Sequence, residues 1–149
     1  MIRLFKEEDA EAVVSLWLDA SIEAHDFVPR SFWEAAADDM RTLYLPMSDA
    51  IVLYVNDESG ELDAFMAFTG DFLAALFVSP RAQGKGVGSR MLRIARRMHP
   101  ELTLAVYKEN RRALAFYEKH GLRVYGERME EKTGCVELLM EFPSVVKNS

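Results

Sequence analysis

Residues 72–98 place an apolar strand, a glycine-rich loop and an amphipathic helix in direct succession, and this order constrains the fold more than any other feature. The apolar run Phe72–Val78 ends at Ser79-Pro80, and the loop that follows has glycines at positions 84, 86 and 88. Apolar residues then recur at helical spacing from Val87 to Met98. Such a loop directs several backbone N–H groups and the positive end of a helix dipole at one place. The segment therefore predicts an anion site, and phosphate is the anion that fits it best.

The charge around this loop supports the same interpretation. The whole chain has a net charge of −6, which argues against general nucleic-acid binding. Residues 72–100 nevertheless contain no Asp or Glu, and their basic residues are Arg81, Lys85, Arg90, Arg93, Arg96 and Arg97. A solvated basic helix face is the alternative explanation, but it does not account for Arg81 and Lys85, which lie in the loop itself.

Length and composition narrow the class of protein. With 149 residues, the chain is expected to form one domain over residues 1–149 and to bury a proper core. Its single cysteine, Cys135, permits no internal disulfide, and the first residues show no secretory signal, so we expect a cytoplasmic protein. The longest apolar run is too short to span a bilayer, so no membrane association is expected. The three histidines and one cysteine lack metal-ligand spacing, and no metal site is expected.

Hydrophobic periodicity and turn residues predict the remaining elements. Strands are expected at 2–4, 51–55, 62–69, 72–78, 102–106, 124–128 and 136–142, and helices at 11–20, 30–44, 87–98 and 111–120. This order predicts an α/β (α+β) fold in which helices cover both faces of a mixed sheet. The continuous apolar character of Phe72–Val78 predicts a strand that is buried on both faces.

Two common nucleotide-binding motifs do not fit the glycine loop. A Walker A loop requires a Ser or Thr directly after its lysine, whereas Lys85 stands between two glycines. The dinucleotide fingerprint requires a third glycine where this chain has Ser89, and an acidic residue where it has Leu104. Both nucleotide interpretations are therefore excluded.

Two motifs, taken together, resemble those of the GNAT superfamily of N-acetyltransferases. The first is Arg-x-x-Gly-x-Gly, formed by Arg81, Gly84 and Gly86 after the apolar strand. The second is Asn-x-x-Ala-x-x-Phe-Tyr-x-x-x-Gly-Leu at 110–122, where the family pattern ends in Phe rather than Leu122. The resemblance extends over essentially the whole chain. It implies a mixed, mostly antiparallel sheet that is splayed at an acetyl-CoA cleft.

The resemblance also implies how acetyl-CoA is bound. Backbone amides of the glycine loop bind its pyrophosphate, and Gly84 and Gly86 are expected to admit the phosphates where a Cβ would collide. Exposed backbone groups of the central strand pair with the pantetheine arm and stabilise the thioester oxygen as it becomes anionic. The cofactor-binding residues implied in this way are Phe77, Val78, Gln83, Gly84, Lys85, Gly86, Val87, Gly88, Ser89, Asn110 and Tyr117.

In this family, an amine attacks the thioester through a tetrahedral intermediate. The resemblance assigns Tyr117 as the acid that protonates the leaving thiolate, and Asn110 as a helix N-cap that also contacts the cofactor. From its spacing alone, Tyr117 fits a core tyrosine with a satisfied hydroxyl. Arg111 and Arg112 are expected to be solvated. A non-catalytic module that binds acyl-CoA is the alternative function.

The general base is not identified by the resemblance. Many relatives carry an acidic residue on the central strand, where this chain has Ala74 and Ala75. The candidates left open are His25 and Asp26 between the first two helices, Asp71 at the strand start, and an ordered water held by backbone carbonyls. The alternative for His25 is a loop histidine that is solvated or hydrogen-bonded structurally.

The acceptor side in this family lies between the first two helices and at the last hairpin, here residues 21–32 and 128–136. The substrate-binding residues expected in the first segment are Glu23, His25, Asp26 and Phe27. Acidic and aromatic side chains there favour a cationic amine, of a small molecule or a peptide, although acidic surface loops are common in an acidic protein. The expected partners are acetyl-CoA and this amine, and the chain is expected to be a monomer or a homodimer.

Overall fold

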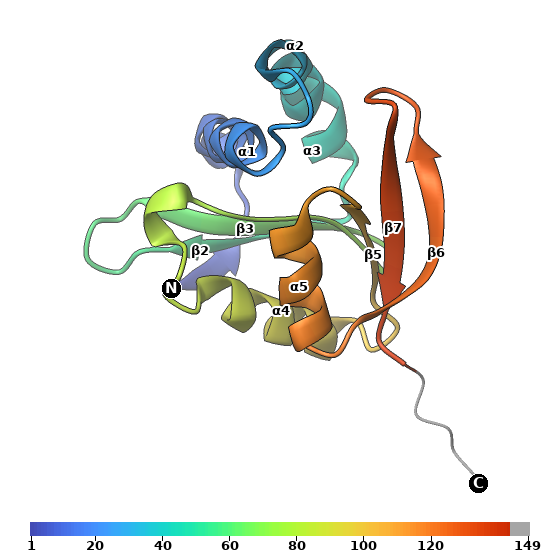
Figure 1. Cartoon of the computed structure of the whole chain (residues 1–149). Coiled ribbons are helices and arrows are strands. Elements are labelled where there is room, and N and C mark those ends of the chain that lie inside the picture. Colours follow the sequence, from blue (N-terminus) through green and yellow to red (C-terminus); the bar gives the residue numbers. More distant parts are fainter. Residues whose placement is uncertain (144–149) are drawn as a thin grey trace, which may run out of the picture.

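A seven-stranded mixed sheet forms the centre of the computed structural model, which describes residues 1–143 (Figure 1). The strand order is β1-β2-β3-β4-β5-β7-β6, and among the described strands only β4 and β5 pair in parallel. The α/β fold with a mostly antiparallel mixed sheet is therefore confirmed. The strands are β1 (Ile2–Leu4), β2 (Ala50–Val55), β3 (Leu62–Thr69), β4 (Phe72–Val78), β5 (Thr103–Tyr107), β6 (Arg123–Glu130) and β7 (Cys135–Glu141).

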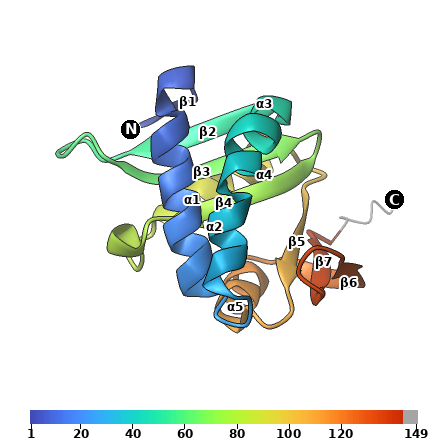
Figure 2. The ribbon, with the colours of Figure 1, turned by 90° about the horizontal axis from the view of Figure 1, so that it is seen from above.

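Helices cover both faces of this sheet, as predicted. Helices α1 to α3 lie over one face, and α4 and α5 lie over the other (Figures 1 and 2). The helices are α1 (Ala10–Ala24), α2 (Arg30–Asp39), the π-helical turn η2 (Met40–Tyr44), α3 (Leu45–Met47), α4 (Val87–Met98) and α5 (Arg111–Lys119), with short 3-10 turns η1 (Glu7–Asp9) and η3 (Pro80–Ala82).

The helix predicted for residues 30–44 is regular only as far as Asp39. Residues 40–44 form a wider π-helical turn, and Pro46 lies in the first turn of α3. Pro46 has no N–H with which to bond the carbonyl of residue 42, so a regular α-helix cannot continue through this position. The wider turn carries Tyr44 to the wall of a cavity described below.

Two apolar clusters, one on each face of the sheet, form the core. Under α4 and α5, Met66 and Phe68 of β3 pack with Met91 of α4. Under α1, Phe65 of β3 packs with Val13 of α1. Strands β2 and β3 both contribute side chains to the two clusters, and β3 is buried on both faces from Asp63 to Phe68.

Strand β4 separates from β5 along most of its length. The two strands pair only through Phe72 and Leu73, which are in register with Thr103 and Leu104. Ala74 is the extra residue of a β-bulge at the point where they part. The prediction that residues 72–78 are buried on both faces is wrong, because Leu73 alone is fully buried and residues 74–78 line the opening.

The hairpin of β6 and β7 rises from the sheet toward α2 and α3 (Figure 1). Lys132 in its turn donates a hydrogen bond to the hydroxyl of Tyr44 in η2, and the ammonium group lies 5.1 Å from the centre of that ring. The hairpin is thereby held against the helical layer. Within residues 1–143, no helix is both long and apolar enough to cross a membrane.

Candidate active site

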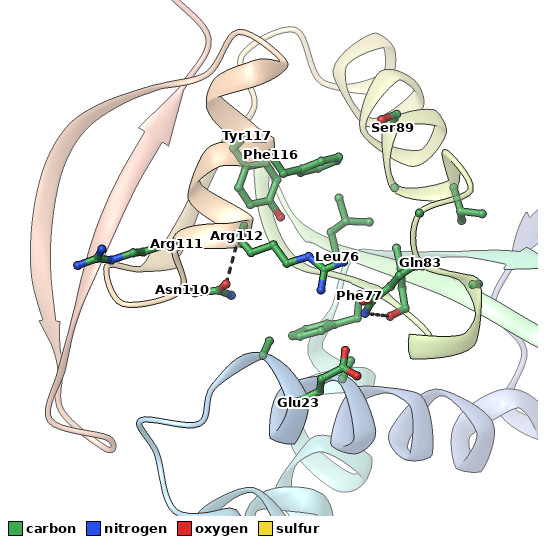
Figure 3. Close-up of a pocket in the computed structure, with 18 of the residues that line it drawn as sticks. Glu23, Leu76, Phe77, Gln83, Ser89, Asn110, Arg111, Arg112, Phe116 and Tyr117 are labelled. Carbon is green, nitrogen blue, oxygen red and sulfur yellow. Dashed lines mark hydrogen bonds between the residues drawn. The ribbon is translucent and has the colours of Figure 1, made fainter.

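Two cavities adjoin at the opening between β4 and β5. The first, of about 670 Å³, is lined by β4, the C-terminal end of α1 and the N-terminal ends of α4 and α5 (Figure 3). The second, of about 620 Å³, is lined by residues of α1, α2, η2, α3 and α5 and of strands β3, β4, β5 and β7. The residues that line both are Leu76, Phe77, Asn110, Ala113 and Tyr117.

The glycine loop forms one wall of the first cavity. Gly84 and Gly86 have φ values of +79° and +81°, a left-handed conformation that strains any residue with a Cβ. Gly86 is also the N-cap of α4, so the free N–H groups of the first helical turn lie at this wall. A Cβ at either glycine would meet no described atom within 4 Å. The backbone conformation, rather than a collision within the protein, is what requires glycine here.

Close packing fixes α4 against α5 beside this loop. A Cβ on Gly88 would lie 3.4 Å from Phe116 Cζ of α5 and 3.6 Å from Val78 Cγ2 of β4. Ser89 Oγ and His120 Nε2 are 2.9 Å apart, which links the start of α4 to the end of α5. These contacts fix the position of α4 relative to α5, and so the positions of the two helix starts that line the first cavity.

All but one of the cofactor-binding residues expected from the resemblance line the first cavity. The exception is Lys85, which is exposed and does not line it. Arg81 does not line it either, because its guanidinium forms ion pairs with Glu61 and Asp63. The residues that do line it are Phe77, Val78, Gln83, Gly84, Gly86, Val87, Gly88, Ser89, Asn110 and Tyr117.

Arg111 and Arg112 are exposed, as expected, and they also line this cavity. Both begin α5, directly after its N-cap Asn110. In Figure 3, Arg112 reaches across the cavity toward Gln83, whereas Arg111 points away from it. Their position next to the motif asparagine is the sequence signal that could have found them, because the first turn of a helix lies beside its N-cap.

The free edge of β4 faces the same space. Phe77 and Val78 line the first cavity, and the Val78 carbonyl accepts a hydrogen bond of 3.2 Å from Gln83 Nε2. In the described structure, β5 pairs with β4 only at residues 72 and 73. Backbone groups further along this edge can therefore pair with an extended ligand, as edge strands do.

Tyr117 stands where the two cavities meet. Its side chain is 9% exposed, and in Figure 3 the hydroxyl points into the cavity. Burial raises the pKa of this phenol well above its usual value, with no contribution from a described side chain. The phenol therefore keeps its proton at neutral pH and can donate it. This differs from a core tyrosine whose hydroxyl is satisfied by the protein.

Asn110 connects α5 to the end of α1. Its Oδ1 accepts a hydrogen bond of 3.2 Å from the Ala113 N–H, which makes it the side-chain N-cap of α5. Its Nδ2 lies 3.2 Å from His25 Nε2. Because Asn110 Nδ2 can only donate, His25 Nε2 is the acceptor and carries no proton. The predicted N-cap role of Asn110 is confirmed.

His25 is buried rather than solvated. It forms the C-cap of α1, is 6% exposed, and packs against Trp33, Phe27 and Tyr107 with ring centres 5.0 to 5.6 Å away. Burial lowers its pKa to about 4, so the ring is neutral at pH 7. The buried atoms His25 Nδ1, Ser21 Oγ and Trp33 Nε1 have no hydrogen-bond partner within residues 1–143.

Asp26 and Asp71, the other candidates for the base, and the remaining residues expected on the acceptor side are spread over the molecule. Glu23 and Asp26 line the first cavity, and the carboxylate of Glu23 points into it in Figure 3. Asp71 lines neither cavity and is 3.0 Å from His99 Nδ1. Phe27 lines neither cavity and packs against His25 and Tyr107, with ring centres 5.6 Å from each. The acidic residues expected on the acceptor side therefore lie beside the glycine-loop cavity.

The second cavity is mainly apolar and aromatic. Its walls include Trp17, Trp33, Tyr44 and Tyr107, and its one charged side chain within the described chain is Glu137. Sequence reasoning missed Glu137, because β7 joins β5 only through tertiary strand pairing. In the described part of the chain, no group of three His, Cys, Asp or Glu residues is arranged to hold a metal ion.

A sheet that opens between its parallel strands, with a glycine-rich helix start beside the opening, is the arrangement that the resemblance implied for an N-acetyltransferase. A family model of the acetyltransferase (GNAT) domain matches residues 47–124. The chain is 30% identical over 146 residues to peptidyl-lysine N-acetyltransferase YiaC of Escherichia coli (strain K12), covering 97% of this chain and 98% of that protein. The chain therefore belongs to the GNAT acetyltransferase family and is an acyltransferase.

Further relatives support this placement. Peptidyl-lysine N-acetyltransferase YjaB of Escherichia coli (strain K12) is 32% identical over 133 residues, which cover 89% of this chain and 88% of that protein. The solution structure of apo-form YjaB from Escherichia coli matches with a TM-score of 0.85 over 97% of this chain and 98% of that one, at 29% identity. The PaiA N-acetyltransferase of Thermoplasma acidophilum, solved with coenzyme A, shares the fold with a TM-score of 0.76 over 97% of this chain and 98% of that one, at 16% identity.

Proposed function

We propose that the protein transfers the acetyl group of acetyl-CoA to the ε-amine of a lysine in a peptide or protein. The observation that carries this proposal is the junction of two cavities at Tyr117, one with a backbone anion site and one with apolar and aromatic walls. Relatives named as peptidyl-lysine N-acetyltransferases favour lysine as the acceptor.

The first cavity suits acetyl-CoA as the donor substrate. The backbone N–H groups between Gly84 and Ser89 form a nest at a helix start, which suits a pyrophosphate. Arg112 supplies a positive charge on the opposite wall. The free edge of β4 at Phe77 and Val78 suits the amide-containing pantetheine arm, and an N–H there can stabilise the oxyanion.

The reaction is a direct attack by the neutral amine on the thioester carbonyl. A C–N bond forms, the tetrahedral intermediate collapses, and the C–S bond breaks to release the CoA thiolate. We assign Tyr117 as the acid that protonates this thiolate, since its buried phenol keeps its proton and its hydroxyl points into the cavity. A lysine amine has a reference pKa near 10.4 and must lose a proton before it attacks.

We assign His25 as a positioning residue rather than the base that takes this proton. Its Nε2 already accepts the hydrogen bond from Asn110, and its pKa of about 4 makes it a weak base. Through Asn110 it holds the start of α5, the helix that carries Tyr117. Water in the second cavity then remains as the carrier of the proton from the amine.

The test is acetylation of a peptide whose N-terminus is blocked and whose single nucleophilic amine is a lysine. We expect thiol release from acetyl-CoA together with a peptide that carries one acetyl group on the lysine. A matched peptide with arginine in place of lysine controls for hydrolysis of the donor. Equal thiol release with both peptides, or none with any lysine peptide, would contradict the proposed function.

A further inference from the structure

Glu137 is the one charged side chain of the described residues that lines the second cavity. It lies in β7, directly opposite Tyr107 of β5 on one side and Arg128 of β6 on the other. Residues directly opposite each other in neighbouring strands share a face of the sheet, so the three side chains form a row on one face. The Glu137 side chain is only 14% exposed.

The surroundings of this carboxylate only partly balance its charge. Arg128 Nε donates a hydrogen bond of 2.9 Å to Oε1 of Glu137, from a side chain that is 52% exposed. The hydrogen bond is made by Nε to a single oxygen, so Oε2 receives none from this arginine. Apolar and aromatic walls surround the rest of the cavity. A carboxylate in such a place gains from a second cationic partner, because the cavity itself offers little solvation.

The chain places one of its own ammonium groups beside a residue of these walls. Lys132 donates a hydrogen bond through Nζ to the hydroxyl of Tyr44, a residue that lines the second cavity. A lysine side chain fits this cavity in both of its parts, with an aliphatic stem for the apolar walls and an ammonium group for the carboxylate of Glu137.

We propose that Glu137 determines acceptor specificity by binding the ammonium group of the acceptor lysine as it enters the second cavity. This inference rests on the proposed function and adds the residue that selects a cationic amine. It replaces Glu23 and Asp26 in that role, because these two line the first cavity. Glu137 binds and orients the ammonium group of the acceptor. The ammonium group then loses its proton to water.

A purely structural role for Glu137, as the partner of Arg128 in the hairpin, makes a different set of predictions. If the ion pair merely holds β6 to β7, Arg128→Gln and Glu137→Gln must have the same effect. If Glu137 binds the acceptor, Arg128→Gln leaves the carboxylate in place and does not weaken acceptor binding. Glu127→Gln is a matched control, since Glu127 is exposed in the same hairpin and lies opposite Leu138, on the other face.

The experiment measures kcat and KM of the wild type and the three variants with the N-terminally blocked lysine peptide. A hydrogen bond to a charged group has an effect on the order of 10- to 100-fold, so Glu137→Gln is expected to raise KM by that factor. Arg128→Gln and Glu127→Gln are expected to change KM by less than about threefold. The affinity for acetyl-CoA, measured by calorimetry, is expected to stay unchanged in all of them.

Calorimetry on the CoA-loaded protein supplies a readout that does not need turnover. The wild type is expected to bind the lysine peptide more tightly than the same peptide with uncharged norleucine, and Glu137→Gln is expected to abolish this preference. Equal selectivity in wild type and Glu137→Gln, or the same loss in Arg128→Gln, overturns the proposal. Selective lysine binding that depends on Glu137 but gives no acetylated product would overturn the proposed function and leave this inference standing.

Discussion

The two cavities of this enzyme are built in different ways. The first is lined by three short continuous stretches: the end of α1, the segment from the end of β4 through the glycine loop into α4, and the start of α5. The last two carry the free backbone N–H groups of helix starts. The second is formed by side chains from five helical segments (α1, α2, η2, α3 and α5) and four strands (β3, β4, β5 and β7), which extend over most of the sequence. In the proposed reaction the donor is always acetyl-CoA, and a site built mainly from local backbone suits a ligand that does not change. The acceptor differs between related enzymes, and a site built from distant side chains can change to fit it.

The largest effect is expected at Tyr117, where the cavities meet. Tyr117→Phe keeps the packing of the ring and removes only the proton, so stability and acetyl-CoA affinity should change little. General-acid assistance is worth roughly 100- to 10,000-fold, and kcat with a lysine peptide should fall within that range. Full activity in an assay limited by chemistry would show that another group protonates the thiolate.

The next effect is a pH-dependent change in the free energy of unfolding caused by His25, a buried residue of the second cavity wall. Burial lowers its pKa from 6.5 to about 4, so the unfolded state binds more protons between these values. The free energy of unfolding should therefore rise with pH from about 4 to 6.5, and this stability is lost as pH falls through that window. At about 1.36 kcal/mol per pKa unit, the change amounts to at most about 3 kcal/mol.

Denaturant unfolding of wild type and His25→Gln at pH 4 and pH 7 measures this contribution. Glutamine does not titrate and can still accept a hydrogen bond from Asn110. The wild type should lose more stability than the variant on acidification. Parallel losses would mean that His25 titrates normally and is not held neutral by burial.

A substitution at Gly86 tests whether the backbone N–H groups at the start of α4 bind acetyl-CoA. Gly86→Leu forces a side chain onto a residue with φ of +81°, so relief of the strain reorients the N–H groups at the start of α4. The affinity for acetyl-CoA should fall on the order of 100-fold, and its thermal stabilisation of the protein should disappear. Gly60→Leu is the matched control, with φ of +74° in a turn that lines neither cavity. Equal loss of acetyl-CoA binding in both variants would point to general destabilisation.

The smallest expected effect is a difference in acetyl-CoA affinity between variants of two basic residues near the first cavity. Arg112 lines the cavity and points into it, whereas Lys85 is exposed outside its walls. Arg112→Gln should weaken acetyl-CoA binding by roughly 10-fold, as expected for a charge-assisted hydrogen bond. Lys85→Gln should weaken it by less than about fivefold, since exposed charges interact weakly. A larger loss for Lys85 in calorimetry at physiological salt would place the phosphates outside the described cavity.

Much of the first cavity could be predicted from the sequence. The glycines of the loop and the asparagine at the start of α5 impose local backbone conformations, which a short motif encodes by itself. The alternation and continuity of apolar residues likewise predicted the strands and helices to within a few residues at most ends. The burial of β4 was predicted wrongly, because apolar side chains that line a ligand cavity have the same composition as those of a core.

Most of the second cavity was decided by the tertiary structure alone. No local pattern indicates that His25 is buried against Tyr107 and bonded to Asn110, or that Glu137 faces the space beside β4. These relations depend on the pairing of β5 with β7 and on the packing of α1 over the sheet, which join residues separated by many positions. Local sequence alone set where the backbone must turn and where its N–H groups gather, because torsion angles are local. Which side chains meet across the opening was decided only when the sheet separated at β4 and the helices packed over it, because burial and charge depend on neighbours from the whole chain.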